Sequence, residues 1–299
     1  MTCPIWMGLF FNLKELLFNI ALRSNMIIIY RRRKLGRTSC REISKLIPNS
    51  FVLRNDMAHK HRSKIIDADV VIRWGCTDTI SIHPVIQKSA AISEVNDKLE
   101  FRRVLNEHNL CPKTYFNIDE VDEWPIALRP RHHAQGRNIK IVNEGEIGYI
   151  PRDWYGSQII NKKREYRVFV VQGRVIAVAQ KFPANEEAFA WNVAQGGRFE
   201  NVSWSQWPLR SVKIAVEAFN LSVLDFGGVD VIEDDNRSYV LEINSAPSLT
   251  SPYRQACMAK GLNYIIANGK DRIPITNERG GYRKFIHPAI SDDAIIGEA

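Results

Sequence analysis

The chain has 299 residues, of which 45% are apolar and 25% charged, and its formal net charge at neutral pH is +8. This length supports a large core divided into two or three subdomains, and the composition is that of a globular protein rather than a disordered or fibrous one. The positive charge favours anionic partners, namely nucleotides, phosphorylated substrates, nucleic acid or acidic peptides, without choosing among them.

Residues 1–25 carry a helical stripe of apolar side chains that polar and charged residues interrupt. The interruptions exclude a transmembrane span, and there is no basic region or clear cleavage site of a signal peptide. Met26 directly precedes a strand-like run. We therefore predict that the folded core begins at Met26, that residues 1–25 form a peripheral helix or a mis-assigned start, and that the protein does not bind membranes.

A small doubly wound β-α-β layer is predicted for residues 26–96. Its strands are expected at Ile27–Tyr30, Phe51–Leu53 and Val70–Trp74, with a helix near Ser39–Ile47. Ser39 and Glu42 have the spacing of a capping box at the start of that helix. The Arg31–Lys34 run is either an anion-binding patch or a solvated loop, and the sequence does not decide between them.

The middle of the chain alternates helical and strand patterns. An amphipathic helix is predicted at Asp97–Asn109, followed by short strands at Ile126–Arg129, Asn138–Val142 and Ser157–Asn161. Arg167–Val171 and Val175–Gln180 have the pattern of a hairpin that turns at Gln172–Gly173–Arg174. A helix at Ser211–Phe219 then leads to a last hairpin, and residues 270–299 are predicted to be a peripheral tail.

The last hairpin is the most informative segment. Two strand-forming runs, Gly227–Glu233 and Ser238–Asn244, flank a polar turn and contain Asp230, Glu242 and Asn244, whose side-chain oxygens could ligate a metal. Carboxylates within strand-forming runs are unfavourable unless a cation compensates them, and such hard oxygen ligands suit Mg²⁺. The alternative is a solvated polar face on an edge hairpin.

The register of this hairpin determines whether the acidic side chains meet. Side chains alternate faces along a strand, which predicts Val240, Glu242 and Asn244 on one face. A three-residue loop at Asp235–Arg237 would set Asp230 directly opposite Glu242. A two-residue loop would break that pairing, so the metal-site hypothesis depends on an odd loop.

Several common catalytic motifs are absent. The sequence contains no P-loop motif, no G-x-G-x-x-G fingerprint, no G-x-S-x-G elbow and no plausible Cys–His pairing. The five cysteines are scattered without CxxC spacing, which argues against zinc and disulfides and favours a reducing compartment. We therefore predict a cytoplasmic protein (host cytoplasm if it is viral).

Basic side chains precede the acidic hairpin in or beside the predicted elements. They are Lys98, Arg129, Lys163, Arg167, Lys181 and Arg198. Any one of them is more often a plain surface charge. As a group they match what phosphoryl transfer needs, because its catalysis consists mostly of positioning and charge neutralisation.

The order of these motifs resembles the ATP-grasp superfamily, and most of all RimK-like, alpha-L-glutamate ligase-type proteins, including relatives common in phage genomes. The resemblance extends from about Ile27 to Ala267 and implies an α+β (α/β) ATP-grasp fold. In that fold a small N-terminal doubly wound layer precedes two α+β subdomains that clamp a nucleotide. The resemblance thus implies a pre-ATP-grasp domain at 26–96, a lid subdomain at 97–162 and a metal-binding subdomain at 163–269.

The resemblance also implies roles for residues on the lid side of the nucleotide. Trp124–Val142 resembles the family's lysine-bearing strand and glycine-rich lid loop, with Arg129 in place of the usual phosphate-binding lysine. Gly136 is the glycine that remains in this loop, and the short stretch that follows implies a reduced lid. Lys98 resembles an earlier nucleotide-contacting lysine.

Further likenesses concern adenine, the phosphates and the metal. Ser157–Lys181 resembles the linker strand and the acidic-x-Arg hairpin that follows it. By this likeness Ile159 and Ile160 line the adenine, Lys163 and Asn192 lie near the nucleotide, Arg167 contacts the transferred phosphoryl group and Lys181 lies beside it. The intervals between Asp230, Glu242 and Asn244 match those of the family's metal ligands.

The activity implied is that of an ATP-dependent carboxylate–amine ligase. A substrate carboxylate would attack the γ-phosphate to form an acyl phosphate and ADP, and an amine would then displace phosphate. Two Mg²⁺ ions, which Mn²⁺ could replace, would bridge the phosphates at the hairpin. The expected partners are ATP and small-molecule or peptide carboxylate and amine substrates.

Two other functions stay open at this point. One is an ATP-grasp kinase or phosphotransferase, in which a hydroxyl replaces the carboxylate. The other is a nucleotide- or nucleic-acid-binding protein without catalysis, which the net charge of +8 would suit. The absence of a basic stretch interleaved with aromatic residues argues against nucleic acid.

Overall fold

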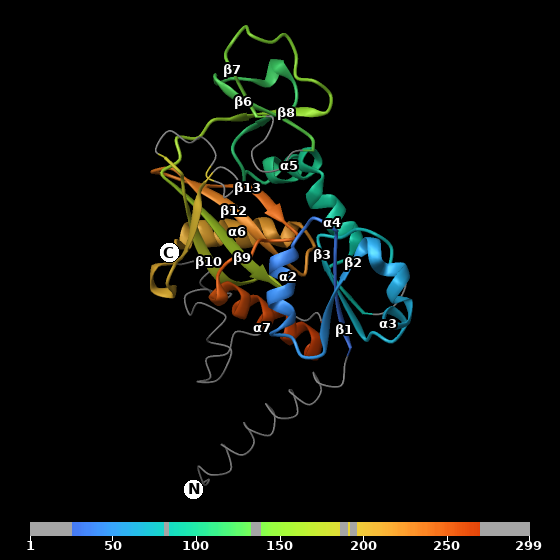
Figure 1. Cartoon of the computed structure of the whole chain (residues 1–299). Helices are drawn as coiled ribbons and strands as arrows, with labels where there is room; N and C mark the ends of the chain where they lie inside the picture. Colours follow the sequence, from blue (N-terminus) through green and yellow to red (C-terminus); the bar gives the residue numbers. More distant parts are fainter. Residues whose placement is uncertain (1–25, 81–83, 133–138, 186–190, 192–195, 270–299) are drawn as a thin grey trace. The chain divides into compact units, whose positions relative to one another are not determined.

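The computed structural model describes residues 26–80, 84–132, 139–185, 191 and 196–269 (Figure 1). The chain divides into two compact units, one that runs to Ser89 and resumes at Ser248, and one that spans Ala90–Pro247. The segments 1–25 and 270–299, as well as Gly136 and Asn192, lie outside the described residues. The three subdomain boundaries predicted from the family resemblance stay predictions.

The first unit contains a parallel four-stranded sheet, as predicted for a doubly wound β-α-β layer. Its strand order is β2-β1-β3-β4, with β1 at Ile27–Arg31, β2 at Ser50–Arg54, β3 at Val70–Trp74 and β4 at Val85–Ile86. Strand β1 is buried along its whole length, which explains its unbroken apolar run. The helical elements of this unit are α2 (Arg37–Ser44), η1 (Asn55–His61), α3 (Arg62–Ile66) and α7 (Pro252–Asn268).

The start of α2 differs from the prediction. Its N-cap is Gly36, with φ at 67° and no side-chain cap, and a Cβ at this position would lie 2.4 Å from the Trp74 ring. The Ser39 hydroxyl instead accepts a hydrogen bond from the backbone N–H of Leu249 at 3.0 Å. The predicted capping box of Ser39 and Glu42 is therefore wrong, because Gly36 is the N-cap and the Ser39 hydroxyl bonds to the segment that leads into α7.

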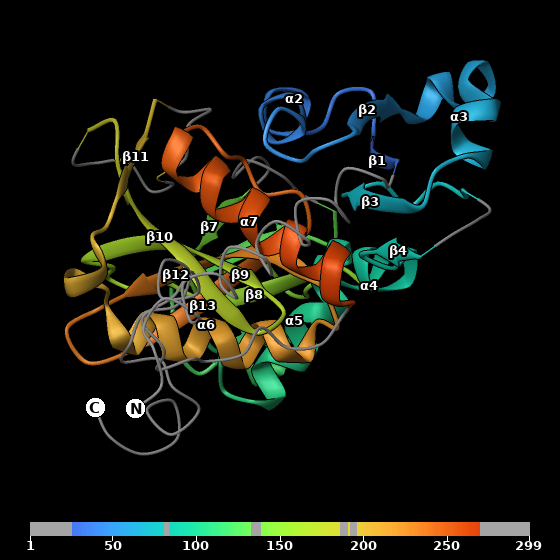
Figure 2. The ribbon, with the colours of Figure 1, turned by 90° about the horizontal axis from the view of Figure 1, so that it is seen from below.

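The second unit is built around a five-stranded antiparallel sheet of order β11-β10-β9-β12-β13. Its strands are β9 (Arg164–Val171), β10 (Arg174–Phe182), β11 (Arg198–Asn201), β12 (Phe226–Glu233) and β13 (Ser238–Asn244). Helix α6 (Leu209–Leu221) packs along one face of this sheet (Figure 2). Valines of β9, β10 and β12 and apolar side chains of α6 form the core between them.

The turn between β9 and β10 is one residue shorter than predicted. Arg174 already pairs with Val171, so only Gln172 and Gly173 lie in the loop. Both have positive φ, 48° and 70°, which is the conformation of a two-residue primed turn.

A smaller four-stranded sheet completes the second unit, with order β5-β8-β6-β7. Its strands are β5 (Thr114–Tyr115), β6 (Ile126–Pro130), β7 (Lys140–Val142) and β8 (Trp154–Gln158). The last of these begins three residues before the predicted Ser157–Asn161 strand. Helices α4 (Ser89–Asn96) and α5 (Lys98–Glu107) precede the sheet, and Asp97 caps α5 by accepting from the backbone N–H of Glu100. None of the helices within the described ranges is long and apolar enough to cross a membrane.

Candidate nucleotide and metal site

Strands β12 and β13 set Asp230 opposite Glu242, which confirms the predicted pairing. The predicted odd loop is wrong, because Glu233 pairs with Ser238 and the loop is the even segment Asp234–Arg237. The loop is stabilised by the Asp234 carboxylate, which accepts hydrogen bonds from the backbone N–H groups of Asn236 and Arg237 at 2.8 and 2.6 Å.

A β-bulge reconciles the even loop with this pairing. The register shifts by one residue between the loop and the acidic pair, and Leu241 is the extra residue. The bulge turns Val240 and Ile243 to the same side, where both join the core beside α6. Glu242 and Asn244 therefore lie on the other face, and the predicted common face is wrong for Val240.

Asp230 on β12 forms ion pairs with two cations, one on β9 and one on β10. Its register partner on β9 is Arg167, whose Nε and Nη2 donate to the two carboxylate oxygens at 2.6 and 2.7 Å. Lys181 on β10 donates to the same carboxylate at 2.7 Å. Burial alone would raise the pKa of Asp230, but the ion pairs with Arg167 and Lys181 outweigh it and lower that pKa.

The ion pairs continue along the sheet beyond Asp230. Lys181 also donates to Glu165 at 2.7 Å, and Glu165 accepts from Lys162 at 2.7 Å. Burial lowers the pKa of Lys162, while the Glu165 carboxylate opposes that effect. Asp230, Glu165 and Lys181 are each only 4% exposed, so this chain of charges is part of the interior.

Two further cations reach the site from outside the large sheet. Lys98, in the first turn of α5, lies 3.2 Å from the Glu242 carboxylate. Arg129 on β6 is the register partner of Tyr155, and its Nε is buried without a hydrogen-bond partner. Burial lowers the pKa of Arg129, and nearby Tyr155 and Glu242 oppose the effect.

Other candidates are placed differently. Ile159 and Ile160 are half-buried between β8 and β9. Lys163 lies 4.0 Å from Asp235 and is 49% exposed, and Arg198 is an exposed partner of Glu200. The structure thus does not bring Lys163 or Arg198 to Asp230.

Sequence reasoning missed Lys162, and it included Glu165 only as the unnamed acidic position of the acidic-x-Arg hairpin. Lys162 precedes a strand in a segment without periodicity, so nothing distinguished it from Lys163. Glu165 could have been found, because it alternates with Arg167 on β9 and strand alternation puts both on one face.

The donor set at the hairpin fits Mg²⁺. Asp230, Glu242 and Asn244 offer hard oxygen ligands. The amide nitrogen of Asn244 is buried without a partner, so its N–H groups are available to an acceptor such as a phosphate oxygen. The described residues contain no cluster of three or more His, Cys, Asp or Glu side chains that could hold a metal. Nucleotide phosphates would therefore have to complete the coordination.

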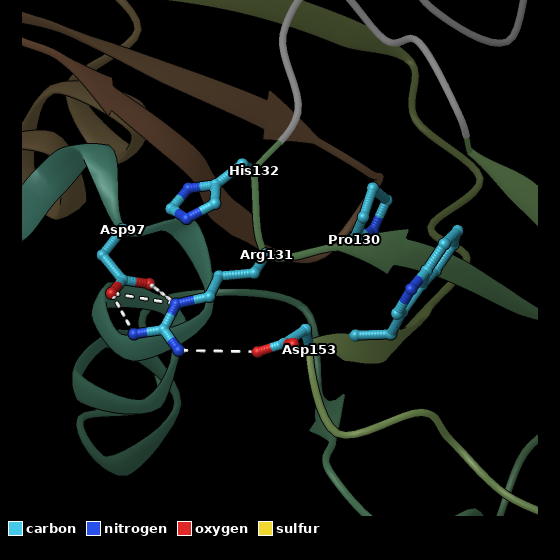
Figure 3. A pocket seen from close by; sticks show the side chains of 6 residues that line it. Asp97, Pro130, Arg131, His132 and Asp153 are labelled. Atoms are coloured by element: carbon cyan, nitrogen blue, oxygen red, sulfur yellow. Dashed lines mark hydrogen bonds and ion pairs between the residues drawn. The ribbon is translucent and has the colours of Figure 1, made fainter.

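A separate hollow lies beside β6 and the start of α5 (Figure 3). Arg131 extends across it, between Asp97 and Asp153, and His132 and Trp154 also line it. The Arg131 guanidinium donates to Asp97 at 2.9 Å and lies 3.6 Å from Asp153. Two carboxylates thus neutralise its charge.

The chain is similar to several known proteins. Residues 157–263 match the RimK-like ATP-grasp domain. A probable alpha-L-glutamate ligase of Rhodopirellula baltica is 28% identical over 181 residues, which cover 54% of this chain and 44% of that protein. The tetrahydromethanopterin:alpha-L-glutamate ligase of Methanocaldococcus jannaschii is 35% identical over 190 residues, which cover 55% of this chain and 63% of that protein. The chain thus spans about half the length of these relatives.

A solved structure shows the same fold. D-alanine–D-alanine ligase from Bacillus anthracis, complexed with ATP, aligns with a TM-score of 0.58 at 14% identity, covering 83% of this chain and 96% of that one. These comparisons lend no support to the predicted link with phage proteins. The match over 157–263 contains Glu165, Arg167, Lys181, Asp230, Glu242 and Asn244. The chain has the ATP-grasp fold, and its residues 157–263 are similar to the RimK-like ATP-grasp domain.

Proposed function

We propose that this chain is an ATP- and Mg²⁺-dependent ligase that activates a substrate carboxylate as an acyl phosphate for attack by an amine. The observation that carries the proposal is the buried cluster in which Arg167 and Lys181 converge on Asp230, with Glu242 directly across the hairpin. A cytoplasmic location, and no membrane or nucleic-acid partner, belong to the same proposal.

The balance of charge in the site supports a polyanionic substrate. Five cations surround three carboxylates, an excess of two positive charges: Lys98, Arg129, Lys162, Arg167 and Lys181 against Glu165, Asp230 and Glu242. Buried charges of one sign without compensation are strongly unfavourable. A nucleotide triphosphate supplies negative charge in the form that clustered Arg and Lys side chains bind.

The residues have distinct expected tasks. Asp230, Glu242 and Asn244 would hold Mg²⁺, which when bound neutralises charge on the β- and γ-phosphates. Arg167 would donate its N–H groups to the γ-phosphoryl oxygens while a carboxylate oxygen of the substrate bonds to that phosphorus and ADP leaves. Lys181 would add positive charge at the same place.

The second half of the reaction needs no protein nucleophile. The amine bonds to the acyl carbon, loses a proton, and phosphate leaves with the electrons of the acyl–oxygen bond. The four cysteines in the described ranges are buried, and burial raises the pKa of Cys40 to about 12. That thiol is therefore unsuited to covalent catalysis.

The names of the two relatives suggest where to look for the amine. One is named a probable alpha-L-glutamate ligase and the other a tetrahydromethanopterin:alpha-L-glutamate ligase. We therefore propose an amino acid as the amine substrate, with L-glutamate as the first to test. The carboxylate partner is to be sought among small metabolites and peptide C-termini.

The test is ATP consumption in hydroxylamine with a panel of carboxylates, because hydroxylamine traps an acyl phosphate as a hydroxamate. We expect ADP, phosphate and a hydroxamate with at least one carboxylate, and none with the Glu242→Gln variant. A stable phosphorylated product would show a kinase instead. Nucleotide binding without turnover across the panel would contradict the ligase.

A further inference from the structure

Arg102, on α5, is a buried cation that the proposed chemistry does not use. It is 4% exposed, and the described part of the chain gives it no carboxylate partner. A buried cation without a counter-ion is unfavourable unless its N–H groups are satisfied. Its guanidinium stacks over the Tyr155 ring at 5.6 Å and donates to two backbone carbonyls of β13.

Those two carbonyls belong to the bulge. Nη1 of Arg102 donates to the carbonyl of Val240 at 3.4 Å, and Nη2 donates to that of Leu241, the extra residue. Among the described strands, β13 is the last of its sheet, so its outer edge pairs with no other of them. The backbone N–H of Val240 donates to the carbonyl of Leu110 at 2.7 Å. Arg102 and Leu110, in the segment after α5, thus supply hydrogen bonds to backbone groups on the edge of β13 where the register changes.

Helix α5 also contacts Glu242, the residue that follows the bulge, through Lys98. Lys98 is one helical turn before Arg102, which puts the two side chains on one face of α5. Lys98 contacts the carboxylate of Glu242 at 3.2 Å, while Arg102 holds the backbone just before it. Without the bulge, the even loop would not set Glu242 opposite Asp230.

We propose that Arg102 is a positioning residue that holds the Leu241 bulge and so sets Glu242 against Asp230 for the metal–nucleotide complex. This inference rests on the proposed function. It assigns Arg102 no contact with ATP or metal. Its effect should therefore appear in the coupling between Mg²⁺ and nucleotide, and not in the binding of nucleotide alone.

The test compares Arg102→Met with Arg103→Met, a matched change at the next residue, which is 45% exposed and pairs with Glu100. Isothermal titration calorimetry measures the affinity for AMP-PNP with excess Mg²⁺ and with EDTA, and the ratio of the two affinities reports the coupling. For Arg102→Met we expect the ratio to fall about 10- to 100-fold, as for other residues that orient metal ligands, with affinity in EDTA within about twofold. Arg103→Met should leave both unchanged.

Arg102→Lys guards against loss of folding, because it keeps the charge and can still reach one carbonyl. Its ratio should lie between those of the wild type and Arg102→Met, and it decides the matter if the methionine variant does not fold. A ratio equal to that of the wild type in Arg102→Lys would overturn the positioning role. So would a variant at Arg102 that loses as much AMP-PNP affinity in EDTA as it loses with Mg²⁺. No Mg²⁺ effect in the wild-type protein would instead contradict the proposed function, and the positioning role with it.

Discussion

Two Arg–Asp pairs in the second unit have similar geometry and very different surroundings. Arg167 grips Asp230 through two hydrogen bonds on the large sheet, with side-chain exposures of 12% and 5%. Arg131 grips Asp97 in the same way beside the small sheet, with exposures of 35% and 23% (Figure 3). The buried pair adds a second cation, Lys181, whereas the exposed pair adds a second carboxylate, Asp153.

The difference in burial indicates which of the two pairs is suited to a catalytic or binding role. Water screens the exposed pair, so its contribution to stability is small and its charge is already neutralised. The buried pair sits where a charge is unfavourable unless matched, so it responds strongly to an arriving anion or cation. Burial rather than pairing geometry therefore separates the candidate site from a structural contact.

The largest expected effect is on stability at Asp230. Asp230→Asn leaves Arg167 and Lys181 without part of their counter-charge in the interior, which should lower the free energy of unfolding by about 3–5 kcal/mol. Urea denaturation followed by circular dichroism measures the change. Asp153→Asn, at a side chain 71% exposed, is the control and should change it by less than about 0.5 kcal/mol. A loss below about 1 kcal/mol for Asp230→Asn would show that the pair behaves like a surface one.

Arg167→Lys should affect turnover next most strongly. Lysine keeps a positive charge beside Asp230 but lacks the planar guanidinium, which donates two parallel hydrogen bonds. The rate of ATP turnover should therefore fall about 100-fold, as when an aligned transition-state donor is removed. The hydroxamate assay gives the rate, and calorimetry gives ATP affinity, which should fall much less. If affinity falls and the rate does not, Arg167 contacts the nucleotide in its ground state.

Arg131→Ala should have the smallest effect on the free energy of unfolding, because the Arg131 side chain is partly exposed and its charge is screened by water. Burial would raise the pKa of Asp97, but Arg131 and the backbone N–H of Glu100 lower it below 3.8. The pair therefore contributes fully above the ordinary pKa, and its contribution disappears as the pH falls through the lowered one. Denaturation curves of both proteins should converge in acid and in high salt; a gap that persists in both would contradict this.

Much of the fold and of the candidate site could be predicted from local pattern. Strands β1, β3, β12 and β13 and helix α5 have clear periodicity and turn signals. The pairing of Asp230 with Glu242 was predicted correctly, but from a three-residue loop that the structure replaces with a four-residue loop and a bulge. What the sequence could not show depends on contacts between distant segments. The Leu241 carbonyl at the bulge accepts a hydrogen bond from Arg102 on α5, and the Ser39 hydroxyl accepts one from the backbone N–H of Leu249. Lys162 pairs with the buried Glu165, whereas the neighbouring Lys163 lies near Asp235 in the β12–β13 loop.

The most direct test of the account is whether Glu242 links nucleotide to Mg²⁺, since this requires no knowledge of the substrates. AMP-PNP affinity is measured by calorimetry with Mg²⁺ and with EDTA, in the wild-type protein and in Glu242→Gln. We expect Mg²⁺ to strengthen binding to the wild type and this strengthening to fall at least about tenfold in the variant, with affinity in EDTA nearly unchanged. Equal strengthening by Mg²⁺ in both proteins would contradict the assignment of the β12–β13 hairpin as the metal end of a nucleotide site.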